Sequence, residues 1–245
     1  MPRKPRMFLP GHPAHLVQRG HNRQPVFFAE EDYLAYQSFL SQAIERYDCA
    51  LHAYVLMTNH VHLLMTPSSE TGISQALQYT GQRYVPYINK KYERSGTLWE
   101  GRFRASIIDS NTYLLACYRY IEMNPVRAGM VTAPEAYRWS SYACNAGTGE
   151  DPLVTPHSRY AALGTTRDEC TRNYRRLFKA ADDGNELQLI REHTRSGTPM
   201  GDDKFRDEIE NTLSVRTGQP QRGRPEKPLA DPLPLDQSIS GQKGL

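Results

Sequence analysis

Two β-rich segments with almost nothing between them constrain this fold most strongly. Residues 51–57 and 60–66 are rich in residues that favour strands, and only Thr58 and Asn59 separate them. A connection of two residues predicts a β-hairpin. We therefore expect an antiparallel sheet built around this pair of strands.

The other segments before residue 148 alternate between strand and helix patterns. Apolar residues at three- and four-residue spacing predict helices, whereas alternating polar and apolar residues predict strands. Proline is expected to divide or end a helix. The expected elements are strands over 14–19 and 102–108, helices over 30–47 and 73–92 with a kink or break at Pro86, and a helix that Asn111 caps and Pro125 ends. Together they predict an α+β fold, in which an antiparallel sheet has its helices packed on one face.

Changes in composition divide the chain into three expected parts. Residues 1–148 carry the sheet and its helices. Residues 149–215 are charged and sparse in apolar positions, which suggests a small accessory helical region. Residues 216–245 are dominated by Gly, Pro, Gln and charged residues, which predicts a disordered, basic and proline-rich tail.

Composition also argues against several classes of protein. The 30 Lys and Arg nearly balance the 27 Asp and Glu, so the net charge of +3 favours a nucleic-acid partner only weakly, although arginine is locally dense. The four cysteines form no CxxC pair, which argues against a zinc knuckle or a disulfide framework. No segment approaches the ~20 apolar residues of a membrane span, and no signal peptide is evident. We expect a cytoplasmic protein without a membrane partner.

Two histidines in the second hairpin strand are the first candidates for chemistry. Side chains alternate across a strand, so His60 and His62 face the same way while Val61 faces the other. Two neutral imidazoles can then reach one divalent ion and leave positions open for oxygen ligands. The alternative is that both are polar residues on the wetter face of a half-buried strand.

The second candidate is a tyrosine near the end of the helix that precedes Pro125. Tyr120 and Asn124 are four residues apart, so both lie on one face of a helix. A tyrosine hydroxyl can attack a phosphodiester when a metal ion polarises the phosphoryl group. Tyr118 with Glu122 forms a competing pair about 200° around the same helix, and spacing alone does not choose between the two pairs.

Four segments of this sequence resemble one known family. They are Val-Gln-Arg-Gly-His-Asn-Arg-Gln-Pro-Val-Phe (17–27), Tyr-Val-Leu-Met-Thr-Asn-His-Val-His-Leu-Leu (54–64), Gly-Thr-Leu-Trp-Glu-Gly-Arg-Phe-Arg (96–104) and Tyr-Ile-Glu-Met-Asn-Pro-Val-Arg-Ala-Gly (120–129). In this order they resemble the IS200-like tyrosine transposases, especially the REP-associated tyrosine transposases of the HUH endonuclease superfamily. The resemblance spans roughly residues 10–145.

The resemblance implies a ferredoxin-like, HUH-type fold and a specific chemistry. It implies that Tyr120 is the nucleophile, that His60 and His62 hold Mg²⁺ or Mn²⁺, and that Asn124 stands where relatives carry a polar third ligand. The implied reaction cuts single-stranded DNA, leaves a 5′-phosphotyrosine link and a free 3′-hydroxyl, and can be reversed to join strands. The implied substrate is a DNA hairpin, bound by a monomer or a homodimer in association with the nucleoid.

Several side chains are candidates for holding DNA. Trp99 and Phe103 can stack on bases, although packing in the core explains them equally well. The sequence Gln-Arg-Gly-Arg-Pro (221–225) resembles the core of an AT-hook, which enters narrow minor grooves, or is a plain basic linker. The candidate phosphate contacts are Arg19, Arg23, Arg83, Arg102 and Arg104, with Arg222 and Arg224 in the tail.

Two other functions fit parts of the sequence. A DNA-binding regulator that recognises palindromes or hairpins would keep the same arginines without using the tyrosine. A zinc hydrolase acting on small molecules would use the two histidines, but the sequence offers neither an obvious third strong ligand nor an acidic general base.

Overall fold

A four-stranded antiparallel sheet forms the centre of the computed structural model, which describes residues 6, 8–179 and 184–214. The strands follow the spatial order β2-β3-β1-β4. Their bounds are Ala14–Arg19 for β1, Cys49–Met57 for β2, His60–Pro67 for β3 and Arg104–Ile107 for β4. The predicted tail, with Arg222 and Arg224, lies outside the described residues.

The predicted hairpin is confirmed, and it fixes the register of the sheet. β2 and β3 pair antiparallel with Met57 opposite His60, and Thr58 and Asn59 form the turn between them. β1 then lies between β3 and β4, where Val17 is opposite His62 on one side and Arg104 on the other. The two-histidine strand is therefore an inner strand of the sheet.

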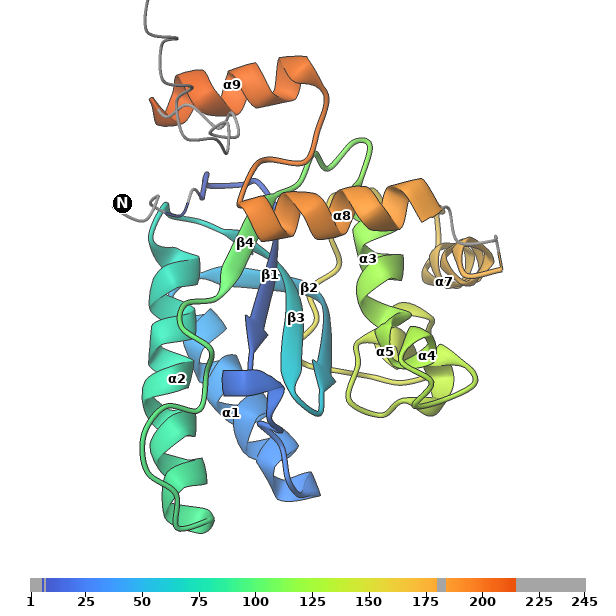
Figure 1. The fold of residues 1–245 in the computed structure, drawn as a ribbon. Coiled ribbons are helices and arrows are strands. Elements are labelled where there is room, and N and C mark those ends of the chain that lie inside the picture. Colours follow the sequence, from blue (N-terminus) through green and yellow to red (C-terminus); the bar gives the residue numbers. More distant parts are fainter. Residues whose placement is uncertain (1–5, 7, 180–183, 215–245) are drawn as a thin grey trace, which may run out of the picture.

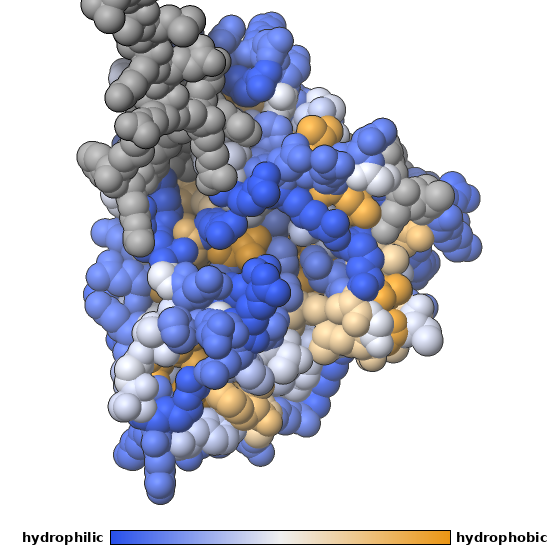
Figure 2. All heavy atoms as spheres, viewed as in Figure 1, coloured by the Kyte–Doolittle hydropathy of each residue, from blue (hydrophilic) through white to orange (hydrophobic). Residues whose placement is uncertain are grey.

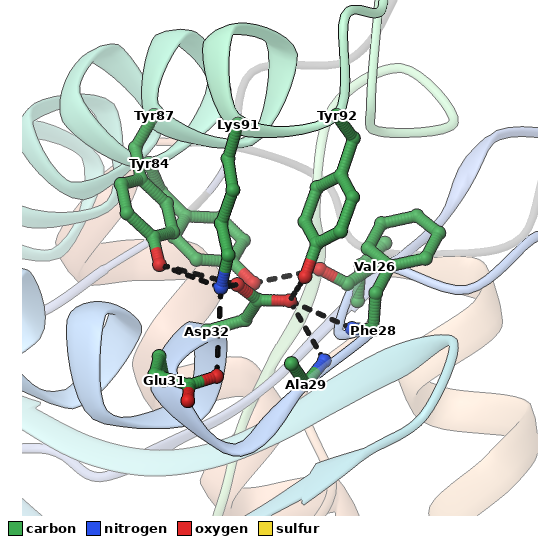
Figure 3. A network of polar contacts seen from close by, with 9 residues as sticks. All are labelled: Val26, Phe28, Ala29, Glu31, Asp32, Tyr84, Tyr87, Lys91 and Tyr92. Atoms are coloured by element: carbon green, nitrogen blue, oxygen red, sulfur yellow. Dashed lines mark hydrogen bonds and ion pairs between the residues drawn. The ribbon is translucent and has the colours of Figure 1, made fainter.

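Two long helices, α1 (Glu30–Arg46) and α2 (Gly72–Lys91), cover one face of the sheet (Figure 1). The buried carboxylate of Asp32 joins them. It accepts hydrogen bonds from the amides of Phe28 and Ala29 at the start of α1, at 2.8 and 2.9 Å. It also accepts from Lys91 Nζ and the Tyr92 hydroxyl at the end of α2, both at 2.8 Å (Figure 3).

Helices also cover the opposite face, so the expectation of helices on one face only was wrong. α3 (Leu114–Glu122) packs there against Val55 and Leu64, while Leu56 and Leu63 belong to the core beneath α1 and α2. The reason is that β2 is apolar along most of its length and buried on both faces. A strand of that composition requires cover on both sides. The predicted α+β class and antiparallel sheet are confirmed.

Proline affects the helices differently from the sequence expectation. α2 continues through Pro86 without a break, with Tyr84 and Ile88 fully buried on either side of it. α3 begins at Leu114 rather than next to Asn111, and Pro125 lies in the first turn of a short helix, α4 (Asn124–Arg127). Proline is tolerated in a first turn because the amide there has no partner within the helix.

The region after residue 148 is helical, as predicted, and one of its helices reaches the sheet. α8 (Gly184–Ser196) crosses β4 and β1 on the face that α3 also covers (Figure 1), and its Ile190 is buried in the same cluster. None of the helices in the described ranges has the length and apolar composition of a membrane span. The remaining helices are η1 (His21–Arg23), η2 (Pro134–Ala136), α5 (Tyr142–Asn145), α6 (Ser158–Ala161), α7 (Arg167–Leu177) and α9 (Asp203–Leu213).

Candidate active site

A basic cavity of about 470 Å³ lies between the sheet, α3 and α8. Alternation along the strands places its floor residues on one face of the sheet. The surface around α8 is mainly hydrophilic, with apolar residues exposed only in patches (Figure 2). The lining residues are His15, Val17 and Arg19 of β1, His60 and His62 of β3, Glu100, Arg102, Arg104, Tyr120, Asn124, and Arg191, Thr194 and Arg195 of α8.

His60 and His62 lie together on this face, as the sequence predicts. Their ring centres are 5.0 Å apart. Burial lowers the pKa of His60 to about 4, helped by the positive charge of Arg19. Burial, followed by the neighbouring His15 and His60, holds the pKa of His62 well below its usual value. Both imidazoles are therefore neutral at pH 7, which is the form that binds metal ions.

The hydrogen bonds of the two histidines show how they fit a metal ion. Nδ1 of His60 lies 2.6 Å from Oδ1 of Asn59, and an amide oxygen can only accept, so Nδ1 carries the hydrogen. The lone pair of His60 is then on Nε2. Nδ1 of His62 lies 2.9 Å from Nε2 of His15, which leaves Nε2 of His62 outside that bond. Two imidazole nitrogens oriented through their other nitrogen are typical of metal ligands.

Tyr120 packs directly against these histidines from α3. Its ring centre is 5.6 Å from that of His62 and 5.5 Å from that of His15, both edge to face. Only 6% of Tyr120 is exposed; the residue belongs to the buried cluster on this face of the sheet and also forms part of the cavity wall. The guanidinium of Arg127 lies 5.0 Å from the ring centre and also donates to the Tyr120 carbonyl. These contacts hold the ring beside the histidine pair.

The competing pair, Tyr118 and Glu122, faces away from the cavity. Both are fully buried among α3, α5 and α7. The Glu122 carboxylate accepts hydrogen bonds from Ser141, Asn145 and Tyr174 at 2.6, 2.8 and 2.5 Å. This arrangement gives Glu122 a role in packing, and of the two tyrosines only Tyr120 adjoins the histidines.

Asn124 lines the cavity with its amide partly occupied. Its Nδ2 donates to the carbonyls of Tyr120 and Ile121, at 2.8 and 3.2 Å, and so caps the end of α3. Its Oδ1 takes no part in these bonds and is a possible metal ligand. Within the described ranges, no three His, Cys, Asp or Glu side chains converge on one point. Two imidazoles and one amide oxygen are therefore the donor set that the protein offers, with oxygen from DNA or water to complete it.

The structure brings together only some of the predicted phosphate contacts. Arg19, Arg102 and Arg104 line the cavity. Arg23 lies in η1 and is not among the lining residues, and Arg83 lies on α2 with its guanidinium 3.4 Å over the ring of Tyr79. Because α2 covers the other face of the sheet, Arg83 is remote from the cavity.

The two aromatic candidates for base stacking belong to the core instead. Trp99 and Phe103 are 6% and 8% exposed, and both pack in the cluster beneath α1 and α2. Phe103 is also covered by the guanidinium of Arg6, 3.6 Å from its ring centre. Packing, the alternative left open by the sequence, accounts for both residues.

Sequence reasoning missed five of the polar lining residues: His15, Glu100, Arg191, Thr194 and Arg195. His15 could have been found, because in the predicted strand 14–19 it alternates onto the same face as Val17 and Arg19. The residues of α8 carried no such signal, since their position depends on how a distant helix packs onto the sheet.

The fold and the site together set a histidine pair and one tyrosine in an arginine-lined cavity on an antiparallel sheet. Residues 10–124 match the family model described as "Transposase IS200 like", which confirms the predicted resemblance. The matched segment includes both histidines, Tyr120 and Asn124. α8, which closes one side of the cavity, lies outside it.

Two individual proteins are similar to this chain. The chain is 27% identical over 123 residues to a Haemophilus influenzae protein that carries the name REP-associated tyrosine transposase, covering 45% of this chain and 69% of that one. A solved structure of a REP-associated tyrosine transposase bound to a REP hairpin has a TM-score of 0.53 and 16% identity, covering 64% of this chain and 92% of that one. This second likeness concerns the fold.

Proposed function

We propose that this protein is a metal-dependent, single-stranded DNA endonuclease and strand transferase that works through a 5′-phosphotyrosine intermediate on hairpin or palindromic DNA. The observation that carries the proposal is the contact of the Tyr120 ring with His62 inside an arginine-lined cavity. The family match supports a transposase-like role on DNA in general.

In the proposed reaction, the Tyr120 hydroxyl oxygen attacks the phosphorus of one phosphodiester. The phenolic proton is released, the bond between phosphorus and the 3′-oxygen breaks, and that oxygen takes up a proton as the free 3′-hydroxyl. The phosphorus stays bonded to the 5′ end of the downstream strand and to tyrosine. Attack by a 3′-hydroxyl reverses the step and joins strands, so no external energy source is needed. Catalysis then depends on positioning and on neutralising charge.

The residues of this chain supply the positioning. His60 and His62 would hold a divalent ion such as Mg²⁺ or Mn²⁺, and Asn124 is the candidate third ligand. A bound cation would withdraw charge from the phosphoryl oxygens. Arg127 fixes the ring of Tyr120 through its guanidinium. Arg19, Arg102 and Arg104 would hold the phosphates on either side of the cut.

The partner implied by this cavity is DNA whose scissile strand is unpaired. One structural neighbour is a complex with a REP hairpin, which supports a hairpin as the substrate class here. The histidines, the tyrosine and the lining arginines all come from a single chain. We therefore infer that one protomer holds a whole active site.

Trapping of the covalent adduct tests the proposal. A DNA hairpin labelled at its 3′ end and flanked by single strands is incubated with Mg²⁺ or Mn²⁺ and resolved on a denaturing protein gel. The wild-type protein should carry the label, because the downstream fragment stays on the tyrosine. Tyr120→Phe should abolish the labelled band, since it removes only the attacking oxygen.

Tyr118→Phe is the matched control, because it removes a hydroxyl from the same helix on its buried side. It should leave the labelled band unchanged. A band that persists in Tyr120→Phe, or that disappears in Tyr118→Phe, would contradict the assignment. Binding of the hairpin without any adduct in the wild type would instead support a DNA-binding regulator that recognises hairpins without cutting them.

A further inference from the structure

A chain of hydrogen bonds runs from His62 along the cavity face of the sheet, through His15 of β1, to α8. Nδ1 of His62 lies 2.9 Å from Nε2 of His15, and Nδ1 of His15 lies 2.8 Å from Oγ1 of Thr194. The Thr194 hydroxyl donates to the carbonyl of Ile190 at 2.8 Å. His62, His15 and Thr194 are all buried, so water does not compete freely for these bonds.

The carbonyl of Ile190 determines which atom donates and which accepts in each of these hydrogen bonds. A carbonyl can only accept, so the single hydroxyl hydrogen of Thr194 points to Ile190. Oγ1 of Thr194 must then accept from Nδ1 of His15. A neutral His15 that donates from Nδ1 offers a lone pair on Nε2, which obliges Nδ1 of His62 to donate.

The consequence falls on the other nitrogen of His62. With its hydrogen on Nδ1, a neutral His62 presents a lone pair on Nε2 beside Tyr120. His60 has the same tautomer through a local bond to Asn59. The two histidines of β3 therefore have the same tautomer for different reasons. His60 is held by Asn59 in the adjacent turn, and His62 is held through His15 by Thr194 of α8.

We propose that His15 and Thr194 are positioning residues that hold His62 in the Nδ1–H tautomer, so that its Nε2 lone pair is ready for a divalent cation. This inference rests on the metal dependence proposed above. It assigns a purpose to α8, whose residues lie outside the matched segment 10–124. Partners of this kind typically change metal affinity by about 10- to 100-fold.

The tautomer of His62 in metal-free protein is the first readout. Long-range ¹H–¹⁵N correlation spectra distinguish a protonated from an unprotonated ring nitrogen. Wild type should show Nδ1 of His62 protonated and Nε2 unprotonated. Thr194→Val removes the hydroxyl without changing the shape of the side chain, so His15 should move its hydrogen to Nε2 and donate to His62, which then protonates on Nε2.

Affinity for Mn²⁺, measured by calorimetry without DNA, is the second readout. Thr194→Val should weaken binding about 10- to 100-fold, whereas Thr194→Ser keeps the hydroxyl and should bind as wild type does. His15→Phe should weaken binding similarly, and combining it with Thr194→Val should add little because both act through one chain of bonds. Amide spectra of each variant verify that the fold is kept.

The outcomes separate this inference from the proposed function. A wild-type His62 protonated on Nε2 would overturn the proposed role of His15 and Thr194. A Thr194→Val variant with unchanged His62 tautomer and unchanged Mn²⁺ affinity would overturn it too. Failure of the wild-type protein to bind either Mn²⁺ or Mg²⁺ would overturn the proposed metal dependence. It would also remove the proposed role of His15 and Thr194 in metal binding. The tautomer of His62 in that same metal-free sample would still test the hydrogen bonds through His15 and Thr194 by themselves.

Discussion

At the scale of single residues, Glu122 makes stability depend on pH. Burial raises the pKa of this carboxyl to about 7, although Ser141, Tyr174 and Asn145 donate hydrogen bonds to it. The folded state thus binds the proton more tightly than the unfolded state, where the pKa is about 4.5. This contribution to stability is full below pH ~4.5 and is lost as the pH rises to ~7, by about 3 kcal/mol in total.

Glu122→Gln tests this dependence because glutamine cannot ionise. Urea unfolding of wild type and variant at steps from pH 5 to pH 8 gives the difference in their free energies of unfolding. Relative to wild type, the variant should become more stable as the pH rises to about 7 and should then keep a constant difference, whatever offset its changed hydrogen bonds introduce. Subtraction cancels the buried histidines, which titrate in both proteins. A difference that stays flat with pH would contradict the raised pKa.

The site residues that could be identified from the sequence are those whose side-chain orientation is set by the local strand or helix. Alternation within β3 places His60 and His62 on one face, and helical spacing groups Tyr120 with Asn124. The choice between Tyr120 and Tyr118 needed the family resemblance, because both faces of α3 carry plausible chemistry. Thr194 was beyond reach, since it acts on His15 from 179 positions away in the chain.

At the scale of elements, α8 supplies a basic edge to the cavity. Arg191 and Arg195 are one turn apart, so both point from the same helix face into the cavity, and both are exposed. A contact with one phosphate of single-stranded DNA contributes about 0.7 to the slope of log affinity against log salt. Arg191→Gln and Arg195→Gln should each weaken binding of a hairpin with single-stranded flanks and lower that slope by about this amount.

Arg83→Gln is the control for this prediction, because Arg83 lies over Tyr79 on α2, which covers the other face of the sheet. Affinities are measured by fluorescence anisotropy over a series of salt concentrations. The slope of Arg83→Gln should equal that of wild type. Unchanged slopes for both α8 variants, or a lowered slope for Arg83→Gln, would show that the DNA lies elsewhere.

Elements with strong local patterns were predicted, and those decided by packing were not. The hairpin and α1 follow from short-range periodicity, and they match the structure closely. The expected division of α2 at Pro86 failed because buried side chains on both sides of the proline hold the helix together. The position of α8 across β1 and β4 depends on contacts with strands at least 77 residues earlier in the chain, which no local pattern encodes.

At the scale of the whole molecule, the sequence predicted the class of fold but not its layers. The antiparallel order followed from one hairpin and from alternation. The second layer of helices was missed, although β2 carried the signal in apolar residues that point both ways. Strands of that kind show that both faces are covered, but they do not show which helices cover them.

The change in composition near residue 148 suggests that the later helices form a separate appendage. Several contacts nevertheless join residues on the two sides of this position. Tyr174 of α7 donates to Glu122, Arg119 pairs with Glu186 of α8 at 2.8 Å, and Thr194 bonds to His15. The two parts share one buried cluster in which Ile190 is almost fully enclosed. We therefore expect the described part of the chain to unfold as one cooperative unit.

Urea unfolding followed by two probes tests this expectation. Both tryptophans, Trp99 and Trp139, lie before residue 148 and report by fluorescence, whereas far-ultraviolet circular dichroism also reports the later helices. The two transitions should coincide in wild type. Ile190→Ala, which leaves a cavity under α8, should lower both midpoints together and reduce stability by about 2–5 kcal/mol. If only the dichroism transition shifted while fluorescence kept its midpoint, α8 would be a separately unfolding appendage, and it could not hold His15 in a fixed orientation.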